Sequence, residues 1–224
     1  MQAERRAFTA DIADIPRERL VYVDESGVAP GQRLGYGYAR RGERACEAAP
    51  LRPRGRLNVI GAIGLGLDHG DDSGGDSGGD DSGGDSGGDD SGGDSGDSGG
   101  GVGGVVMRSY PVNVCSAVFE HFVETALAPL LRPGMIVVWD NARIHSRRAV
   151  EAVEARGARV RAQPRYSPDM NAIEMAWSKV KRSVRRARAD TPTALGEAIE
   201  AAVASVSLSD IGAWVRHVTH PQPT

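Results

Sequence analysis

The stretch MIVVWDNARIHSRRAVEAVEARGARVRAQP, residues 135–164, decides the centre of the fold. It opens with an apolar run that ends at Asp140, as a buried strand does. Ser146 is a suitable N-cap for the segment that follows and Gly157 a suitable stop, so a helix is expected between them. A second short strand is expected at 159–164. A strand, a helix and a strand within about thirty residues predict a right-handed parallel unit.

Further strands are expected before this unit, and helices on both sides of it. The Gly- and Arg-rich stretch 33–50 is expected to form one irregular strand and a loop. The other strand-like segments are 20–23, 56–67 and 102–113. Helical segments are expected at 114–131, 171–189, 192–207 and 209–218, and residues 1–19 as a short helix or an arm. This order predicts an α/β fold in which a mixed sheet carries helices on its faces.

An acidic low-complexity run, residues 68–101, masks the character of the rest of the chain. Between Asp71 and Ser98 there are ten Asp and no basic residue. Removing those ten charges turns the formal net charge from -3 into +7. The remaining chain is therefore basic, and a basic protein is expected to meet a polyanion.

The run repeats DDSGGDSGG with a period of nine residues, a period also found in calcium-binding β-rolls. It has no apolar residue to fill the interior of such a roll, so it cannot offset the entropy of ordering. We expect a disordered, solvated insert, with an ordered calcium-binding module as the less favoured alternative. If the strands at 56–67 and 102–110 pair, the run replaces a hairpin tip, where each doubling of a flexible loop costs only about 0.6 kcal/mol.

The remaining composition indicates one domain without disulfides. Cys46 and Cys115 have neither disulfide-framework nor metal-site spacing and are expected to be reduced thiols in a cytosolic protein. No apolar window reaches the length of a membrane span, so no membrane partner is expected. The predicted organisation is a catalytic domain at 20–219, interrupted by the insert at 68–101, with an arm at 1–19 and a tail at 220–224.

Three isolated acids are better candidates for chemistry than the acidic run. Asp24 and Asp140 each follow an apolar strand and are expected at its end, where a charge is costly unless it is paired or bound to a cation. Either Asp alone can be a strand-end cap, and Glu174 can form a capping box with Asn171 as the N-cap. Together, three carboxylates at one point would suit a pair of Mg²⁺ ions that act on a phosphodiester.

The helix that carries Glu174 is expected to have a core-facing stripe and a basic face. The core stripe is Ile173, Trp177, Val180 and Val184. A basic face is often only solvated, but one sign of charge beside a proposed metal site favours contact with a nucleic-acid backbone. The DNA-binding candidates are Lys179, Lys181, Arg182, Arg185, Arg186 and Arg188.

At these residues the sequence resembles the catalytic domain of DDE-type transposases of bacterial insertion sequences, in the mariner-like superfamily. The matching motifs are VDESG with Asp24, WDNARIH with Asp140 and PRYSPDMNAIE with Glu174. The 33 residues between Asp140 and Glu174 fit the narrow spacing of that superfamily. The resemblance covers nearly the whole chain outside the acidic run.

The resemblance implies a ribonuclease-H-like fold, a five-stranded mixed sheet flanked by helices. It implies Mg²⁺-dependent DNA cleavage at the ends of the element, with Mn²⁺ as an alternative ion, and then attack of a freed 3′-hydroxyl on target DNA. Asp24, Asp140 and Glu174 would be the ligands of two metal ions. The protein would act as a homodimer on DNA, in the cytoplasm and associated with the nucleoid.

The same motifs imply supporting residues. Asn141, Arg143 and His145 would lie beside the metal ions, with His145 as a positioning residue or DNA contact rather than a general base. The turn that presents Glu174 would be shaped by Tyr166, Ser167, Pro168 and Asn171. The family usually has Pro at the positions of Arg165 and Ala172 and Leu at that of Gln163, so we expect a less preorganised turn.

Members of this family also carry an N-terminal helix-turn-helix region that reads the ends of the element. This region would be supplied by a separate or frameshifted reading frame, or the chain would be an inactive remnant that only binds DNA weakly. A further hypothesis is that the acidic run mimics DNA and lies against the basic face.

Overall fold

A computed structural model describes residues 2–36, 38–44, 46, 55–67 and 104–220. The acidic run, with its predicted disorder and the calcium-binding alternative, and the end of the predicted tail lie outside these residues. Five strands form one sheet in the order β3-β2-β1-β4-β5. They are β1 (Leu20–Val28), β2 (Leu57–Ile63), β3 (Val105–Tyr110), β4 (Ile136–Trp139) and β5 (Arg159–Ala162).

The sheet is mixed, as predicted. The pairs β1–β2 and β2–β3 are antiparallel, whereas β1–β4 and β4–β5 are parallel. The expected parallel unit at 135–164 is therefore confirmed, as is the pairing of the two strands on either side of the acidic run. That run connects β2 to β3, at the position of a hairpin tip.

Strand β1 is longer than the sequence suggested. Asp24 was expected at its end, but the strand continues through Asp-Glu-Ser-Gly to Val28. The reason is the antiparallel partner: β2 pairs with β1 as far as Val28↔Leu57. The parallel partner β4 pairs only from Leu20 to Tyr22. Asp24 therefore lies inside β1, just beyond the point where β1 and β4 part.

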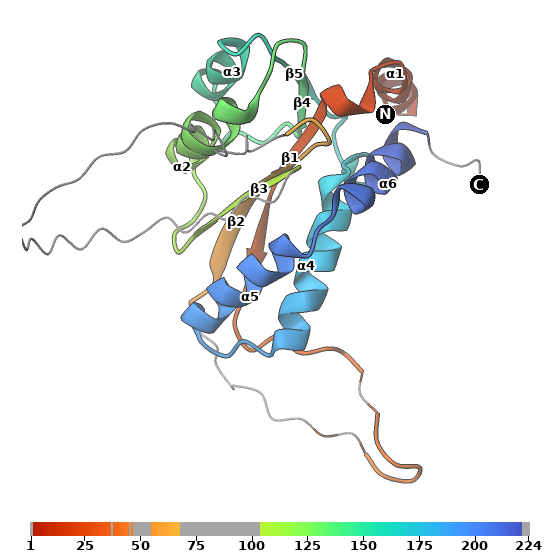
Figure 1. Ribbon diagram of the computed structural model, residues 1–224, viewed down its shortest axis with the longest axis vertical. Coiled ribbons are helices and arrows are strands. Elements are labelled where there is room, and N and C mark those ends of the chain that lie inside the picture. Colours follow the sequence, from red (N-terminus) through yellow and green to blue (C-terminus); the bar gives the residue numbers. More distant parts are fainter. Residues whose placement is uncertain (1, 37, 45, 47–54, 68–103, 221–224) are drawn as a thin grey trace, which may run out of the picture.

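Helices cover both faces of the sheet (Figure 1). The helices are α1 (Gln2–Ala13), α2 (Ser116–Phe122), α3 (Arg147–Glu154), α4 (Ile173–Ala187), α5 (Pro192–Ala204) and α6 (Leu208–Thr219). Helix α2 continues through one π turn, Val123–Leu127, and a 3-10 turn, Ala128–Leu130. The first segment, for which either a helix or an arm was expected, is thus a helix from Gln2 to Ala13.

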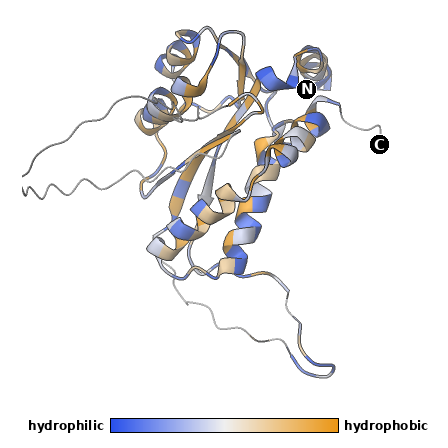
Figure 2. Ribbon diagram, in the orientation of Figure 1, coloured by the Kyte–Doolittle hydropathy of each residue, from blue (hydrophilic) through white to orange (hydrophobic). Residues whose placement is uncertain are grey.

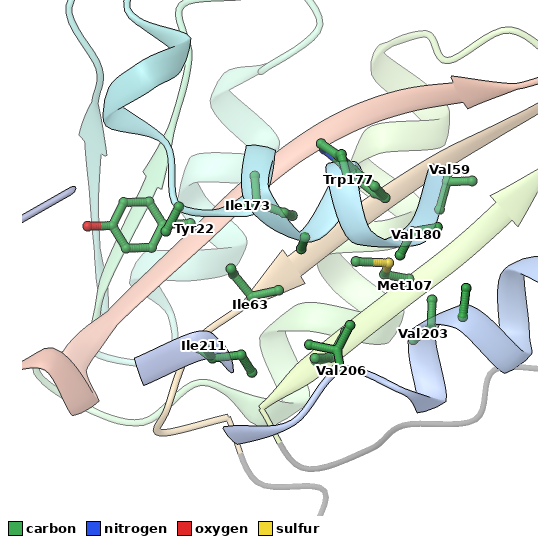
Figure 3. Close-up of a cluster of buried hydrophobic side chains, with 14 of the residues drawn as sticks. Tyr22, Val59, Ile63, Met107, Ile173, Trp177, Val180, Val203, Val206 and Ile211 are labelled. Carbon is green, nitrogen blue, oxygen red and sulfur yellow. The ribbon is translucent and has the colours of Figure 1, made fainter. Parts of the chain in front are cut away.

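Two hydrophobic clusters form the core, one on each face of the sheet. In the first, α4, α5 and α6 pack on side chains of β1, β2 and β3 (Figure 3). Trp177 and Ile173 of α4 lie over this face together with Tyr22 and Met107. In the second cluster, α2 and α3 pack on the opposite face. Figure 2 shows the corresponding orange stripes of the helices turned toward the sheet.

The capping residues of α3 were predicted correctly. Ser146 Oγ accepts a hydrogen bond from the backbone N–H of Ala149 at 3.3 Å. Gly157 follows the helix with φ of 72°, a left-handed conformation that favours glycine. These two residues fix where the crossover between β4 and β5 begins and ends.

The irregular strand expected within 33–50 is absent from the described part of that stretch. After β1 the chain leaves the sheet and crosses to the connection between α4 and α5. There Gly31 N–H donates to the carbonyl of Ala189 at 2.8 Å, and Arg33 pairs with Asp190 at 2.8 Å. These contacts hold the segment away from the sheet edges.

In the part of the chain that the structure describes, no disulfide forms and Cys46 and Cys115 are exposed. No single described helix is long and apolar enough to cross a membrane. Only α5 and α6 together reach the required length and composition, and the two are bent by 78° at their junction. Both helices bury their apolar side chains in the first cluster.

Candidate active site

The three predicted acids face one cleft of about 480 Å³ at the point where β1 and β4 part. Asp24 comes from β1, Asp140 directly follows β4, and Glu174 lies in the first turn of α4. The other residues that line the cleft are Asn141, Ala142, Arg143, Gln163, Pro164, Arg165, Tyr166, Ser167, Pro168 and Asn171. The structure thus brings the sequence-predicted motifs to one place.

Asp24 is held in a largely apolar environment. Its Oδ2 accepts a hydrogen bond from Trp177 Nε1–H at 3.0 Å. Burial, followed by the nearby charges of Glu174 and Glu25, raises the pKa of Asp24 to about 7, against the hydrogen bonds that favour its ionised form. The carboxylate is therefore costly to ionise where it stands.

A glycine on the neighbouring strand makes this arrangement possible. Gly61 of β2 is the register partner of Asp24. A Cβ at Gly61 would come within 2.9 Å of Trp177 Cη2 and 3.0 Å of Met107 Cγ. The small residue therefore leaves space for the indole that donates to Asp24. This close packing explains why the strand expected at 56–67 is rich in Gly and Ala.

Asp140 begins a tight turn and is exposed. Its Oδ1 accepts from the backbone N–H of Ala142 at 2.8 Å. Asn141 Nδ2–H donates to the carbonyl of Gln163 at 2.6 Å, which ties the end of β4 to the segment after β5. Asn141 and Arg143 lie on the cleft wall, as expected.

His145 lies behind the cleft, with only 5% of its side chain exposed. Its Nδ1 is 2.8 Å from the carbonyl oxygen of Asp140, and its Nε2 is 3.1 Å from Glu25 Oε1. The ring packs against Phe119 at 4.4 Å and Trp139 at 5.1 Å between centroids. This burial favours the positioning role for His145 over the DNA contact.

Burial alone would lower the pKa of His145, but the hydrogen bond and charge of Glu25, aided by Asp140, raise it on balance. Glu25 was not singled out from the sequence. It follows Asp24 in the strand, so the two carboxylates point to opposite faces of the sheet. Glu25 meets His145 on the α2 side, while Asp24 meets Trp177 on the α4 side.

The capping-box alternative for Glu174 is wrong. The residue before α4 is Ala172, and the described residues give α4 no side-chain N-cap. Asn171 is buried instead, with Nδ2 at 3.5 Å from the carbonyl of Val23. Ala172 has φ of -60°, the value that Pro would impose, so this position is compatible with Pro and the weaker preorganisation of the turn stays a prediction.

The turn before α4 has a strained residue at its tip. Tyr166 has φ of 55° and is 89% exposed, whereas Ser167 is buried. Pro168–Met170 form a 3-10 turn that leads into Asn171. Two buried polar atoms beside the cleft, Gln163 Nε2 and Asn171 Oδ1, have no hydrogen-bond partner among the described residues. Both residues line the cleft, and the hydrogen-bonding capacity of these two atoms is unmet within the described residues.

The carboxylates share a cleft but do not form a finished metal-binding site. Within the described ranges, no three His, Cys, Asp or Glu side chains stand close enough to hold a metal ion. The Asp140 side chain is 53% exposed and hydrogen-bonded to its own turn. Simultaneous coordination by all three acids therefore requires a side chain to move.

The basic residues on and after α4 differ in their surroundings. Lys179, Arg182 and Arg186 line a groove beside Trp214 of α6. Lys179 is also occupied, because its Nζ pairs with Asp210 Oδ2 and donates to the carbonyl of Ser205, each at 2.6 Å. Lys179 is therefore the one of these three groove residues for which partners within the protein are shown, and the predicted DNA contact of the basic face stays a prediction.

Lys181 and Arg185 lie on the stripe of α4 that begins with Glu174, since they follow it at helical spacing. Arg188 lies just past the helix, in a left-handed conformation with φ of 55°. The helix was expected to reach residue 189 but ends at Ala187. Five of the six basic candidates therefore lie on α4, and Arg188 lies past its end.

Comparisons with known proteins match part of the sequence and the fold. A family model described as DDE superfamily endonuclease matches residues 105–195, a range that contains Asp140 and Glu174. No curated protein matches the chain.

Several solved structures have the same fold. The Mos1 transposase paired-end complex with left transposon end is 15% identical with a TM-score of 0.64, over 97% of this chain and 59% of that one. The Mos1 Strand Transfer Complex is 14% identical with a TM-score of 0.61, over 97% and 57%. The Mos1 transposase catalytic domain with Raltegravir and Mn is 12% identical with a TM-score of 0.56, over 97% and 89%.

This chain thus spans about 59% of the length of the Mos1 transposase in the first of these structures, and 89% of the catalytic domain in the last. The expected ribonuclease-H-like fold is confirmed.

Proposed function

We propose that the chain is a DDE superfamily endonuclease, the family whose model matches residues 105–195, and that its cleft cleaves DNA as the catalytic domain of a transposase. The observation that carries this proposal is the meeting of Asp24, Asp140 and Glu174, from three separate elements, in one cleft. Burial of Asp24, together with the nearby charge of Glu174, makes its ionisation costly, and the raised pKa of Asp24 reports that cost. A divalent cation would offset it.

The donor set fits Mg²⁺ or Mn²⁺. Both ions favour carboxylate, amide and water oxygens, and the residue Asn171, which carries an amide, lines the same cleft as the acids. Asp140 is the side chain best placed to move, because it is 53% exposed and its contacts, with Ala142 and His145, are both to Oδ1. We propose two ions, as for other carboxylate sites that act on phosphodiesters.

Each residue then has a defined task. The ions would be bound by Asp24, Asp140 and Glu174, with Asp24 held in place by its hydrogen bond from Trp177. When bound, they would offset the negative charge of the scissile phosphate and activate the attacking water or 3′-hydroxyl. His145, fixed between Glu25 and the Asp140 carbonyl, would orient the Asp140 turn. Arg143 and Arg165 on the rim of the cleft would contact phosphates on either side of the cleaved bond.

DNA would leave the cleft along α4. Lys181 and Arg185 continue the stripe of Glu174, so a phosphate backbone that starts at the cleft can run along them. Lys179 is not part of this path, because Asp210 neutralises it. Arg182 lies three residues before Arg185 and is its neighbour on the helix surface, so Arg182 and Arg186 would flank this path on the side of the groove beside Trp214.

The reaction and the partners proposed for this chain are based on the solved structures with a similar fold. The Mos1 structures include complexes with a transposon end and a strand transfer complex. We propose that this chain likewise joins element ends to target DNA, as the enzyme of an insertion sequence. In this proposal it acts as a dimer on DNA, with a helix-turn-helix region reading the element ends, in the cytoplasm. An inactive remnant is less favoured, because the three acids and their supporting contacts are intact.

Cleavage of a supercoiled plasmid or an element-end duplex tests the proposal. Asp24→Asn, Asp140→Asn and Glu174→Gln should each abolish Mg²⁺-dependent nicking while circular dichroism stays unchanged. Glu154→Gln, at an exposed acid of α3 far from the cleft, is the matched control and should nick like the wild type. Nicking retained in any of the three variants would remove that residue from the site.

A further inference from the structure

Helix α1 contacts the turn that presents Glu174. Arg5 of α1 donates from Nη1 to Ser167 Oγ at 2.9 Å and to Asp169 Oδ1 at 3.0 Å. Its Nη2 forms an ion pair with Asp169 Oδ2. One guanidinium thus holds two residues of the turn, more than 160 residues away in sequence. Such bidentate contacts fix direction as well as distance.

Helix α1 is itself firmly anchored. Phe8 and Ile12 are buried in the first hydrophobic cluster at 2% and 0% exposure. On the β5 side, Asp11 pairs with Arg161, whose guanidinium also lies 5.9 Å from the centre of the Phe8 ring. Arg5 therefore extends from a fixed helix, and it can transmit that rigidity to the turn.

The turn needs such support. Tyr166, a residue with a side chain, takes a left-handed φ of 55° immediately before Ser167, and this conformation is unfavourable for residues other than glycine. Ser167 Oγ donates to the carbonyl of Arg165 at 3.2 Å while it accepts from Arg5. The Arg5 contact therefore closes a hydrogen-bonded chain across the strained residue.

We propose that Arg5 is a positioning residue for the active site: it holds the turn at 165–171, and through it Asn171 and Glu174, in the geometry that the cleft requires. The effect of Arg5 on catalysis rests on the proposed function, whereas its effect on the turn at 165–171 does not depend on that function. In this proposal α1 supports the active site through Arg5 and is not only an arm beside the domain.

The electrostatics agree with a tight contact. The hydrogen bond from Arg5 lowers the pKa of Asp169, and Asp169 in turn raises that of Arg5. The Arg5 and Asp169 side chains are 34% and 61% exposed, so the pair contributes little to global stability. Its loss should therefore loosen the turn without unfolding the protein.

Limited proteolysis tests the structural half. Chymotrypsin can cut after the exposed Tyr166 only when the turn opens, and the 97% exposed Tyr38 provides an internal reference cut in the same chain. Arg5→Ala should raise the rate of cleavage after Tyr166, relative to Tyr38, by about fivefold. Arg6→Ala removes the same charge from the next, exposed residue and should leave the ratio unchanged.

Two further variants separate positioning from simple damage. Arg5→Lys keeps the charge but not the fork geometry, and should restore the wild-type ratio only in part. The exchange Arg5→Asp with Asp169→Arg should restore it further than either single change. In the nicking assay, Arg5→Ala should lower kcat by about three- to tenfold, with the KM for DNA unchanged.

An unchanged cleavage ratio in Arg5→Ala, or an equal rise in Arg6→Ala, would overturn the inference. If the wild-type protein does not nick DNA, the proposed function fails, and the proteolysis ratio still decides whether Arg5 holds the turn. A raised ratio with a normal kcat would show that the turn is held but that catalysis does not depend on it, which overturns the positioning role.

Discussion

Replacing Asp24 by Asn should make the metal-free protein more stable, although it removes a proposed catalytic group. The amide keeps the shape of the side chain and an oxygen that can accept from Trp177 Nε1–H, 3.0 Å away. It removes the charge that burial and the neighbouring acids make costly. The folded protein has a pKa of about 7 at Asp24, against an ordinary value of 3.8.

The expected gain in stability of Asp24→Asn follows from this shift in the pKa of Asp24. Three pKa units correspond to about 4 kcal/mol, and since water reaches the cleft, about 2 kcal/mol is the expected gain. The gain depends on pH. Between about pH 4 and 7, Asp24 of the folded wild type keeps a proton that the unfolded chain has released, so the stability of the wild type falls as pH rises. Asn does not titrate, so the advantage of the variant should be near zero at pH 4 and greatest above pH 7.

Urea unfolding in EDTA at pH 4.5 and pH 8 measures this difference. Asp14→Asn, at an exposed acid after α1, is the control and should track the wild type at both pH values. Mg²⁺ should then stabilise the wild type and not Asp24→Asn. A variant that is no more stable than the wild type at pH 8, or whose advantage is the same at both pH values, would refute the reasoning.

Three further outcomes are expected. Trp177→Phe keeps the buried ring but loses the N–H donor, and should raise the Mg²⁺ concentration for half-maximal nicking about tenfold; an unchanged midpoint would contradict that role. Lys179→Ala should lower the free energy of unfolding in urea by up to about 1 kcal/mol and leave DNA affinity unchanged. Lys181→Ala should lower DNA affinity and reduce the slope of log affinity against log salt concentration by about one. The reverse pattern would contradict the proposed path of DNA along α4. Deleting residues 71–98 should keep the fold by circular dichroism, and DNA affinity that stays unchanged at low salt would refute the idea that the acidic run mimics DNA.

Local patterns predicted much of this fold. The apolar run before Asp140, the N-cap at Ser146 and the stop at Gly157 are short-range signals, and the crossover they define is present. The stripe of α4 that packs on the sheet also follows from spacing in the sequence. The motifs around the three acids were sufficient to place them in one cleft.

Contacts between distant segments account for what the sequence did not predict. Glu-Ser-Gly after Asp24 has the composition of a turn, but β2 pairs with it and extends the strand. The buried state of Asn171 depends on Val23, far away in the chain, and this replaces the expected helix cap. In the same way, no local pattern reveals that Asp210 occupies Lys179 or that Arg5 reaches the turn before α4.

Anomalous diffraction from crystals of the protein soaked in Mn²⁺ tests directly whether the cleft binds metal. We expect a Mn²⁺ peak in the cleft, within about 2.2 Å of carboxylate oxygens from Asp24 and Asp140, with Glu174 facing it, and loss of that peak in Asp24→Asn. Mn²⁺ bound elsewhere while the cleft stays empty at saturating concentration would contradict it.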